Sequence, residues 1–331
     1  MNYKKKVGHL LAPGDYYFSG NEAAAEGAIA AGCQYYAGYP ITPSSEIMEH
    51  LANRFGELGR VFTQMEDEIA SICSVIGAVW AGAKGMTATS GPGFSLMQEA
   101  IGYAAFTETP LVIIDVQRAG PGTGQATRSA SGDHMQAKWG SHGDYQVISL
   151  SPWSVQEMYD FTLKAFNLAE TYRVPVFLMS EEAIGHLREK TTIHDEVELV
   201  DRLKIPGAAP FGTESTDGVP PMPAFGEGEN LLVTGSTHDD VGYRKTADPE
   251  TQARLVERIN LKVLNRRDDI VETEAHLVED AEILVVAYGF TARSAMFAVD
   301  HLRKQGKKVG LLRLKTIWPF ADRVIRSYDG K

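Results

Sequence analysis

The sequence predicts an α/β protein with a doubly wound parallel sheet and a second, smaller α/β domain. From residue 20 onward, helical and strand patterns alternate at the short spacing that parallel strands with crossover helices require. Two continuous apolar runs, Pro110–Val116 and Pro175–Met179, suit strands that are buried on both faces. The 331 residues exceed the size at which a single core stops growing, so two domains are expected.

The boundary residues of the first helix and strand are well marked. Asn21 is predicted to cap a helix over Glu22–Ala31, which Gly32 ends. A strand over Tyr35–Tyr39 follows and runs into Pro40. This unit opens the first domain.

A second helix is expected to begin at Thr42, with Pro43 at its first position, because Ile47, Leu51 and Phe55 recur every four residues. The other elements expected in this domain are, in chain order, a strand over Val61–Gln64, a helix over Glu66–Ala83, a strand over Gly85–Thr89 that breaks at Ser90-Gly91-Pro92-Gly93, a further helix, the strand Pro110–Val116, a helix over Val155–Tyr172 and the strand Pro175–Met179.

Four segments follow from these patterns: an N-terminal extension over 1–19, the first domain over 20–199, a linker or arm over 200–279 and the second domain over 280–331. The arm is broken by Pro, Gly and Asp and holds one polar helix candidate, Asp248–Asn265. In the second domain we expect the strand Ala281–Tyr288, the helix Arg293–Lys304 and the strand Lys308–Arg313. Roughly fifty residues is near the lower limit for a domain, so this part packs on the first domain, is completed by a partner, or is shortened.

Composition excludes several classes of protein. The net charge of −11 has the wrong sign for binding nucleic acid or an anionic membrane surface. No apolar stretch approaches the length of a membrane helix, and the basic start is not followed by the apolar region of a signal peptide, so a cytoplasmic location is expected. Cys33 and Cys73 are too few for an iron–sulfur cluster or a disulfide framework.

Four polar segments stand where predicted strands end: 39–45, 66–68, 89–93 and 115–118. Ligands of open parallel sheets collect at the carboxyl ends of the strands. These segments are therefore expected to share one edge of the sheet, which we call the rim, and one site.

The segments carry a family resemblance. Tyr-Pro-Ile-Thr-Pro-Ser-Ser at 39–45, a glutamate at 68 opening a small-residue helix and Thr-Ser-Gly-Pro-Gly at 89–93 resemble the pyrimidine-binding domain of thiamine diphosphate enzymes. With Gln117-Arg118 and His-Gly-Asp-Tyr at 142–145, the chain resembles the alpha subunit of 2-oxoacid:ferredoxin oxidoreductases of the 2-oxoglutarate or 2-oxoisovalerate type. The similarity covers residues 18–190, and residues 281–320 are similar to the second, transketolase C-terminal-like domain of these subunits, which usually continue further.

Glu68 is the catalytic candidate. The resemblance implies that its carboxyl hydrogen-bonds the far ring nitrogen of the cofactor's aminopyrimidine and favours the imino form that deprotonates the thiazolium. Spacing alone also fits a plain alternative, in which Glu66, Asp67 and Glu68 are acids in a first helical turn.

Thr42 and Arg118 are the candidates for holding the substrate carboxylate. A helix start offers free amides to an anion, and an arginine fork clamps a carboxylate with two bonds. An N-cap threonine and a structural ion pair are the alternatives. The resemblance favours the substrate role for both, and adds Tyr39 and Ile41 beside the substrate, with Pro40, Ser90 and Gly91 beside the cofactor.

No metal site is expected in this chain. The histidines show no ligand spacing, His142 is read as a structural or substrate-loop residue, and Gly120–Gly124 lacks the pattern of a phosphate loop and is read as a flexible loop near the site. The Gly-Asp-Gly segment that binds magnesium and diphosphate in thiamine enzymes is also absent. The resemblance therefore implies a beta subunit that carries magnesium, the diphosphate and a [4Fe-4S] cluster, with gamma and ferredoxin-like delta subunits as further partners.

The expected function is oxidative decarboxylation of 2-oxoglutarate or 2-oxoisovalerate, with the acyl group passing to coenzyme A and the electrons to ferredoxin, only in complex with the beta subunit. Two alternatives stay open: a subunit of a non-redox thiamine-dependent 2-oxoacid decarboxylase, and a non-catalytic assembly subunit.

Overall fold

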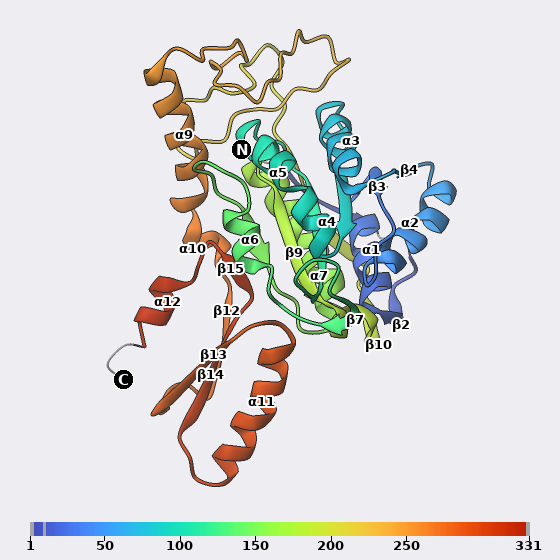
Figure 1. The fold of residues 1–331 in the computed structure, drawn as a ribbon, viewed down its shortest axis with the longest axis vertical. Helices are drawn as coiled ribbons and strands as arrows, with labels where there is room; N and C mark the ends of the chain where they lie inside the picture. The colour runs from blue at the N-terminus through green and yellow to red at the C-terminus, as the bar shows by residue number, and fades with distance from the viewer. Residues whose placement is uncertain (1–2, 9–10, 329–331) are drawn as a thin grey trace.

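The computed structural model describes residues 3–8 and 11–328 and confirms the α/β fold class (Figure 1). Its main sheet has eight strands, seven of them in the order β15-β8-β9-β6-β5-β3-β4, with β7 paired to β6 alone. Neighbours from β8 to β4 are parallel, whereas β15 and β7 are antiparallel to their partners. The strands are β3 (Tyr35–Gly38), β4 (Val61–Gln64), β5 (Gly85–Thr89), β6 (Val112–Ala119), β7 (Gln125–Ser129), β8 (Ile148–Leu150), β9 (Val176–Glu181) and β15 (Thr316–Trp318).

Helices cover both faces of this sheet. Apolar side chains of α1 (Gly20–Ala30), α2 (Ser45–Glu57) and α7 (Val155–Tyr172) form one buried cluster with the strands. Those of α3 (Glu68–Trp80), α4 (Gly91–Leu96) and α5 (Gln98–Phe106) form a second cluster on the opposite face. Strands buried in this way need apolar residues on both sides, which explains the continuous apolar runs in the sequence.

Three helix starts differ from the sequence prediction. Ser19, not Asn21, caps α1, because its hydroxyl and the Glu22 carboxylate form a reciprocal capping box. The second helix begins at Ser45 rather than Thr42, and the Thr42–Pro43 peptide is cis and lies in the preceding loop. The third begins at Glu68 with Asp67 as its N-cap, so it is shorter at both ends than predicted.

The strand β6 is longer than predicted. It continues to Ala119 and so includes Gln117 and Arg118, which the sequence placed beyond its end. Residues 120–124 then turn the chain back into β7, which pairs antiparallel with β6. Alternation along a strand puts Asp115 and Gln117 on one face of the sheet and Arg118 on the other.

The N-terminal segment is tied to the far end of the first domain by two antiparallel pairs. Strand β1 (Tyr3–Gly8) pairs with β11 (Glu196–Asp201), and β2 (Gly14–Ser19) pairs with β10 (Arg188–Ile193). Short helices α6 (His134–Trp139) and α8 (Glu182–His186) complete this domain.

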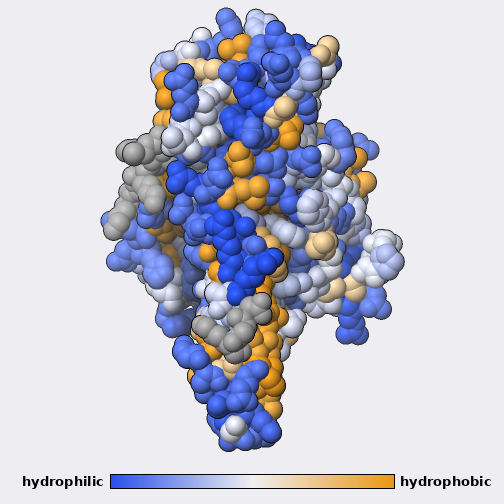
Figure 2. Space-filling view, turned by 90° about the vertical axis from the view of Figure 1, so that its left-hand side faces the viewer, coloured by the Kyte–Doolittle hydropathy of each residue, from blue (hydrophilic) through white to orange (hydrophobic). Residues whose placement is uncertain are grey.

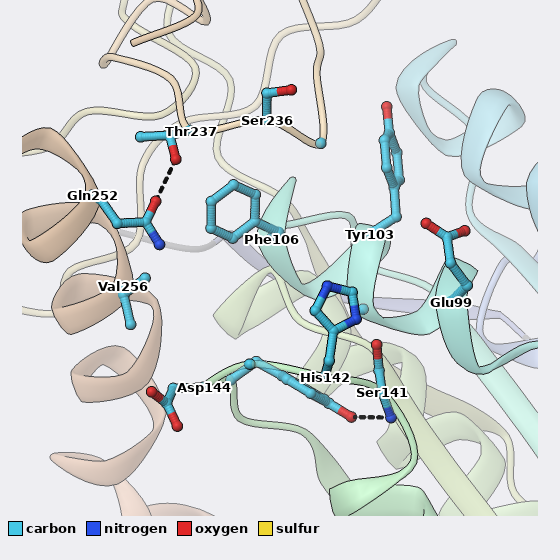
Figure 3. A pocket seen from close by; sticks show the side chains of 14 residues that line it. Glu99, Tyr103, Phe106, Ser141, His142, Asp144, Ser236, Thr237, Gln252 and Val256 are labelled. Atoms are coloured by element: carbon cyan, nitrogen blue, oxygen red, sulfur yellow. Dashed lines mark hydrogen bonds between the residues drawn. The ribbon is translucent and has the colours of Figure 1, made fainter. Parts of the chain in front are cut away.

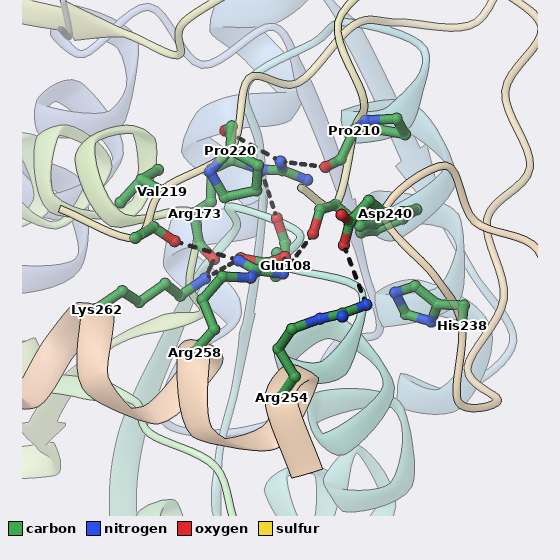
Figure 4. A network of polar contacts seen from close by, with 12 residues as sticks. Glu108, Arg173, Pro210, Val219, Pro220, His238, Asp240, Arg254, Arg258 and Lys262 are labelled. Carbon is green, nitrogen blue, oxygen red and sulfur yellow. Dashed lines mark hydrogen bonds and ion pairs between the residues drawn. The ribbon is translucent and has the colours of Figure 1, made fainter. Parts of the chain in front are cut away.

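Residues 202–248 form an arm without a regular helix or strand and cross the molecule beside α9 (Pro249–Leu264), at the top of Figure 1. A buried charge network fixes this arrangement (Figure 4). Glu108 accepts hydrogen bonds from Arg258 Nη2 at 2.6 Å and Lys262 Nζ at 2.7 Å, both on α9. Arg173 donates to the carbonyls of Pro210 and Pro221 in the arm at 2.7 and 2.9 Å.

A smaller lobe follows α10 (Arg267–Ile270). Its sheet has the order β12-β14-β13, built from β12 (Thr273–His276), β13 (Ile283–Ala287) and β14 (Val309–Leu314), with α11 (Gly289–Lys304) and α12 (Asp322–Arg326). Figure 2 shows hydrophobic surface running along this lobe, where Ile283, Val286, Phe290 and Phe297 are exposed. None of the helices in the described part of the chain combines the length and apolar character that crossing a bilayer requires.

Candidate functional site

The predicted rim brings together the carboxyl ends of β3, β5 and β6, which are parallel neighbours in the sheet. Arg118 near the end of β6 reaches across to the loop after β3, and its Nη1 donates to the Thr42 carbonyl oxygen at 2.8 Å. Arg118 is buried, so its charge is held in a partly desolvated position. The structure therefore places two of the predicted residues, Arg118 and Thr42, side by side.

Glu68 stands at the start of α3 on the same rim. Its side chain is buried, with a residue exposure of 4%, although it carries a carboxyl. Burial raises the pKa of Glu68, the Asp67 carboxylate raises it further, and the Arg118 guanidinium lowers it. Because Arg118 acts on this pKa, the two groups lie within electrostatic range of each other.

The Thr-Ser-Gly-Pro-Gly turn wraps around Glu68. A Cβ added at Gly93 would overlap Oε1 of Glu68 and Oγ1 of Thr89, so only glycine leaves room for the carboxyl there. Ser90 Oγ is fully buried and has no hydrogen-bond partner among the described residues. An unsatisfied hydroxyl beside a cradled carboxyl fits an aminopyrimidine, which offers both a donor and acceptors.

Residues 39–42 form the open side of the rim. Tyr39 is 39% exposed, Pro40 and Thr42 are exposed, and Ile41 is half-buried. Since Thr42 precedes the first residue of α2 by three positions, it does not stand at a helix start, and its predicted use of free helix amides is wrong. Its side chain is open to a ligand, while its carbonyl is held by Arg118.

A second group of polar side chains lies beneath the rim, and the sequence analysis gave it no role. Its members are Asp115, Gln117, Asp133 and His134. All four are at least partly buried, and Gln117 Oε1 accepts from the Asp133 backbone N–H at 2.9 Å. The sequence did mark Asp115 as unusual, because it is the one charged residue in the apolar run 110–116. No sequence pattern marked Asp133 and His134, because they come close to β6 only in the folded chain.

His142 lies elsewhere. It lines a cavity of about 460 Å³ between α5, residues 141–145, the arm and α9, together with Glu99, Tyr103 and Asp144 (Figure 3). None of the predicted substrate or cofactor residues lines this cavity. In the described part of the chain, no three His, Cys, Asp or Glu side chains gather in a way that could hold a metal ion.

Two family models match the chain. Residues 26–258 match the thiamine diphosphate-binding domain of pyruvate flavodoxin/ferredoxin oxidoreductases. Residues 281–330 match core domain II of pyruvate:ferredoxin oxidoreductase.

Similar proteins agree with these models. The chain is 54% identical over 317 residues to 2-oxoglutarate synthase subunit KorA of Methanothermobacter thermautotrophicus, covering 95% of this chain and 84% of that protein. It is 40% identical to ketoisovalerate oxidoreductase subunit VorB of the same organism, covering 94% and 82%. Among solved structures, a 2-oxoglutarate:ferredoxin oxidoreductase from Magnetococcus marinus, with 2-oxoglutarate, coenzyme A and succinyl-CoA bound, matches with a TM-score of 0.89 and 32% identity. This chain covers 56% of that longer chain, and 95% of this chain is matched.

Proposed function

The chain belongs to the thiamine diphosphate-binding family of pyruvate flavodoxin/ferredoxin oxidoreductases, and we propose that it is the subunit that activates the cofactor's pyrimidine in a 2-oxoacid:ferredoxin oxidoreductase. The reaction is the oxidative decarboxylation of a 2-oxoacid, with transfer of the acyl group to coenzyme A and of two electrons to ferredoxin. When bound, thiamine diphosphate supplies the nucleophilic carbon that adds to the keto group and accepts the charge left by the departing carbon dioxide.

The buried Glu68 carboxyl carries this proposal. Its burial and raised pKa allow it to keep or share a proton with a ring nitrogen of the pyrimidine. The Gly93 cradle fixes the direction in which the carboxyl points. Ser90 and Gly91 would border the same ring from β5, and Pro40 from the loop after β3.

Arg118 is the proposed clamp for the substrate carboxylate. Nη1 is held by the Thr42 carbonyl, which orients the guanidinium fork toward the rim. The Thr42 hydroxyl and the side chains of Tyr39 and Ile41 would complete this side of the pocket. A fixed positive charge here binds the carboxylate before it is lost as carbon dioxide.

We assign the diphosphate, magnesium and an iron–sulfur cluster to a beta subunit. The 331 residues contain no Gly-Asp-Gly segment, and of their two cysteines Cys33 is buried while Cys73 lies on α3. The relatives are named as subunits, which supports a hetero-oligomer. Gamma and delta subunits would be further members, and reduced thiols suit the cytoplasm.

The proposed substrate is 2-oxoglutarate. Relatives named 2-oxoglutarate synthase subunits are 43–55% identical in four organisms, against 39–40% for the ketoisovalerate subunits.

The test is viologen reduction by the complex purified with its partner subunits, given coenzyme A, thiamine diphosphate, magnesium and one 2-oxoacid at a time. Reduction with 2-oxoglutarate, and at least tenfold less with 2-oxoisovalerate and pyruvate, is expected. Preference for 2-oxoisovalerate would replace 2-oxoglutarate as the proposed substrate but leave the proposed enzyme class, a 2-oxoacid:ferredoxin oxidoreductase, unchanged. Carbon dioxide release without reduction would instead identify a non-redox decarboxylase, and inactivity of a cofactor-loaded complex with every acid would favour an assembly role.

A further inference from the structure

A second pair of carboxyls lies behind the Glu68 site. Asp115 on β6 has an exposure of 0%, and neither of its carboxyl oxygens has a hydrogen-bond partner of ordinary geometry. Asp133, the N-cap residue of α6, is mostly buried, and its Oδ2 also lacks a partner. Buried polar atoms without partners are rare in native proteins, so this group needs a physical explanation.

The pair adjoins the turn proposed to hold the pyrimidine. Asp115 is in register with Thr89 on the neighbouring parallel strand, directly before Ser90. The Gly91 N–H faces the Asp115 carboxyl. A Cβ on Gly91 would stand 3.7 Å from Asp133 Oδ2, so both carboxyls border this residue.

Two neighbouring carboxyls at a largely buried position oppose each other's ionisation. Burial raises the pKa of both, and Asp133 raises that of Asp115 further, whereas Asp115 lowers that of Asp133. A hydrogen bond in which the two carboxyls share one proton removes one of the two charges. Such a bond would also satisfy oxygen atoms that otherwise have no donor.

The surroundings contribute no cation to neutralise the pair. No lysine or arginine among the described residues acts on the pKa of either carboxyl. His134 on α6 is neutral near pH 7, since burial lowers its pKa to about 4. Glu68 on α3 and Glu181 on β9 are further carboxyls at this end of the sheet, and Arg118 projects from the opposite face of β6.

A backbone brace keeps Asp133 in place. Gln117 accepts from the Asp133 N–H at 2.9 Å, and its Nε2 donates to the Ser180 carbonyl on β9 at 2.9 Å. The brace links the start of α6 to two strands of the sheet and so fixes the backbone from which the Asp133 carboxyl projects.

We propose that Asp115 and Asp133 share one proton and that this acid pair positions the Ser90–Gly91 turn beside Glu68. Both are positioning residues, since they act on the cofactor through the turn. Loss of the shared proton sets two negative charges against each other beneath the turn and displaces it. The role in catalysis rests on the proposed function, whereas the shared proton does not.

The shared proton is tested on the full chain alone by infrared spectroscopy near pH 7. The carbonyl-stretch band of the shared proton should be lost in Asp115→Asn. It should be shifted in Asp133→Asn, where the buried Asp115 keeps its proton but loses its carboxylate partner. It should be unchanged in Glu66→Gln, which changes an exposed carboxylate of the same rim segment. A band at the wild-type position in Asp133→Asn would mean an isolated acid and overturn the sharing, as would a band retained in Asp115→Asn.

The positioning role is tested by the pH dependence of viologen reduction in the complex. Wild type should lose turnover on the alkaline side as the pair ionises. Asp115→Asn and Asp133→Asn, which carry a permanent donor, should keep turnover near neutrality within about tenfold and extend the alkaline limb by about one pH unit. Asp115→Ala should lose turnover at every pH.

Superimposable pH profiles for wild type and both asparagine variants would overturn the positioning role. A wild-type complex that is inactive with every 2-oxoacid would instead count against the proposed function, and the infrared comparison would still decide whether the proton is shared.

Discussion

At the scale of single residues, three consecutive acids on one segment have three different environments. Glu66 is exposed, Asp67 accepts from the Ala70 N–H as the helix cap, and Glu68 is buried under the Gly93 turn. Burial raises the pKa of Glu68. Burial of one carboxyl among otherwise ordinary helix-start acids thus separates the catalytic candidate from its neighbours.

Replacing Glu68 with glutamine should lower turnover of the complex by about 10²–10⁴, the range for losing a positioned acid–base group. The fold should survive, because burial disfavours the ionised form of Glu68 and the neutral amide removes this penalty. Steady-state viologen reduction and thermal unfolding measure the two effects. Glu66→Gln is the matched control and should retain full turnover; wild-type activity in Glu68→Gln would remove Glu68 from the chemistry.

Replacing Arg118 with alanine should raise KM for the 2-oxoacid by roughly 10- to 100-fold, the equivalent of a lost charge-assisted hydrogen bond. Lysine at this position should recover part of the loss, since it restores the charge without the fork. Michaelis constants for both variants in the complex test this. An unchanged KM in Arg118→Ala would place the substrate carboxylate elsewhere.

At the scale of elements, the strand β6 serves two sites because its side chains alternate. Arg118 on one face ties down the loop after β3. On the other face, Asp115 borders the turn before α4, and Gln117 accepts from the Asp133 backbone N–H. This turn encloses the side chain of Glu68, the first residue of α3. The geometry of the site therefore depends on how these short elements pack, and one added methyl group can disturb it.

Gly93→Ala should reduce turnover by about 10²-fold, because the new Cβ displaces the Glu68 carboxyl and a shift of about 1 Å is enough for such a loss. Gly77→Ala is the matched control within α3, where a Cβ meets no other atom within 4 Å. It should leave turnover unchanged and raise the free energy of unfolding by about 0.5–1 kcal/mol. Equal turnover in both variants would show that the cradle is not needed.

At the scale of the whole molecule, one buried carboxylate joins the arm and α9 to the sheet domain. Glu108 is bonded by Arg258 and Lys262, and Arg173 connects the same network to arm carbonyls. Burial alone would raise the pKa of Glu108, but the Lys262 and Arg258 cations lower it below its ordinary value. Its removal would leave buried cations without a counter-charge.

Glu108→Gln should lower the free energy of unfolding by about 3–5 kcal/mol, measured by urea denaturation at pH 7. Because the folded-state pKa lies below the ordinary value of 4.5, this stabilisation is complete above that pH and is lost as the pH falls further, so the difference from wild type should shrink in acid. Glu227→Gln, which breaks an exposed ion pair with Lys204 in the same arm, should cost no more than about 1 kcal/mol. Equal losses in the two variants would contradict the account.

The proposed division of the cofactor between chains predicts weak binding to this chain alone. Titration calorimetry with thiamine diphosphate and magnesium should give a Kd about 100-fold or more above that of the complex with the beta subunit, since the chain supplies only the pyrimidine half. Comparable affinity in the isolated chain would place the diphosphate site here.

The sequence by itself determined the α/β class, the main-sheet strands β3, β4, β5, β6 and β9, and the family, because periodicity, glycine turns and the Tyr-Pro-Ile-Thr-Pro and Thr-Ser-Gly-Pro-Gly segments are local patterns. It misplaced the starts of α1, α2 and α3 because Ser, Thr, Asn and Asp are near-equivalent caps and backbone geometry chooses among them. The tertiary structure alone decided which of three acids is buried. Likewise, only the fold brought Asp133 to Asp115 and Glu108 to α9, because contacts between residues far apart in sequence leave no periodic signal.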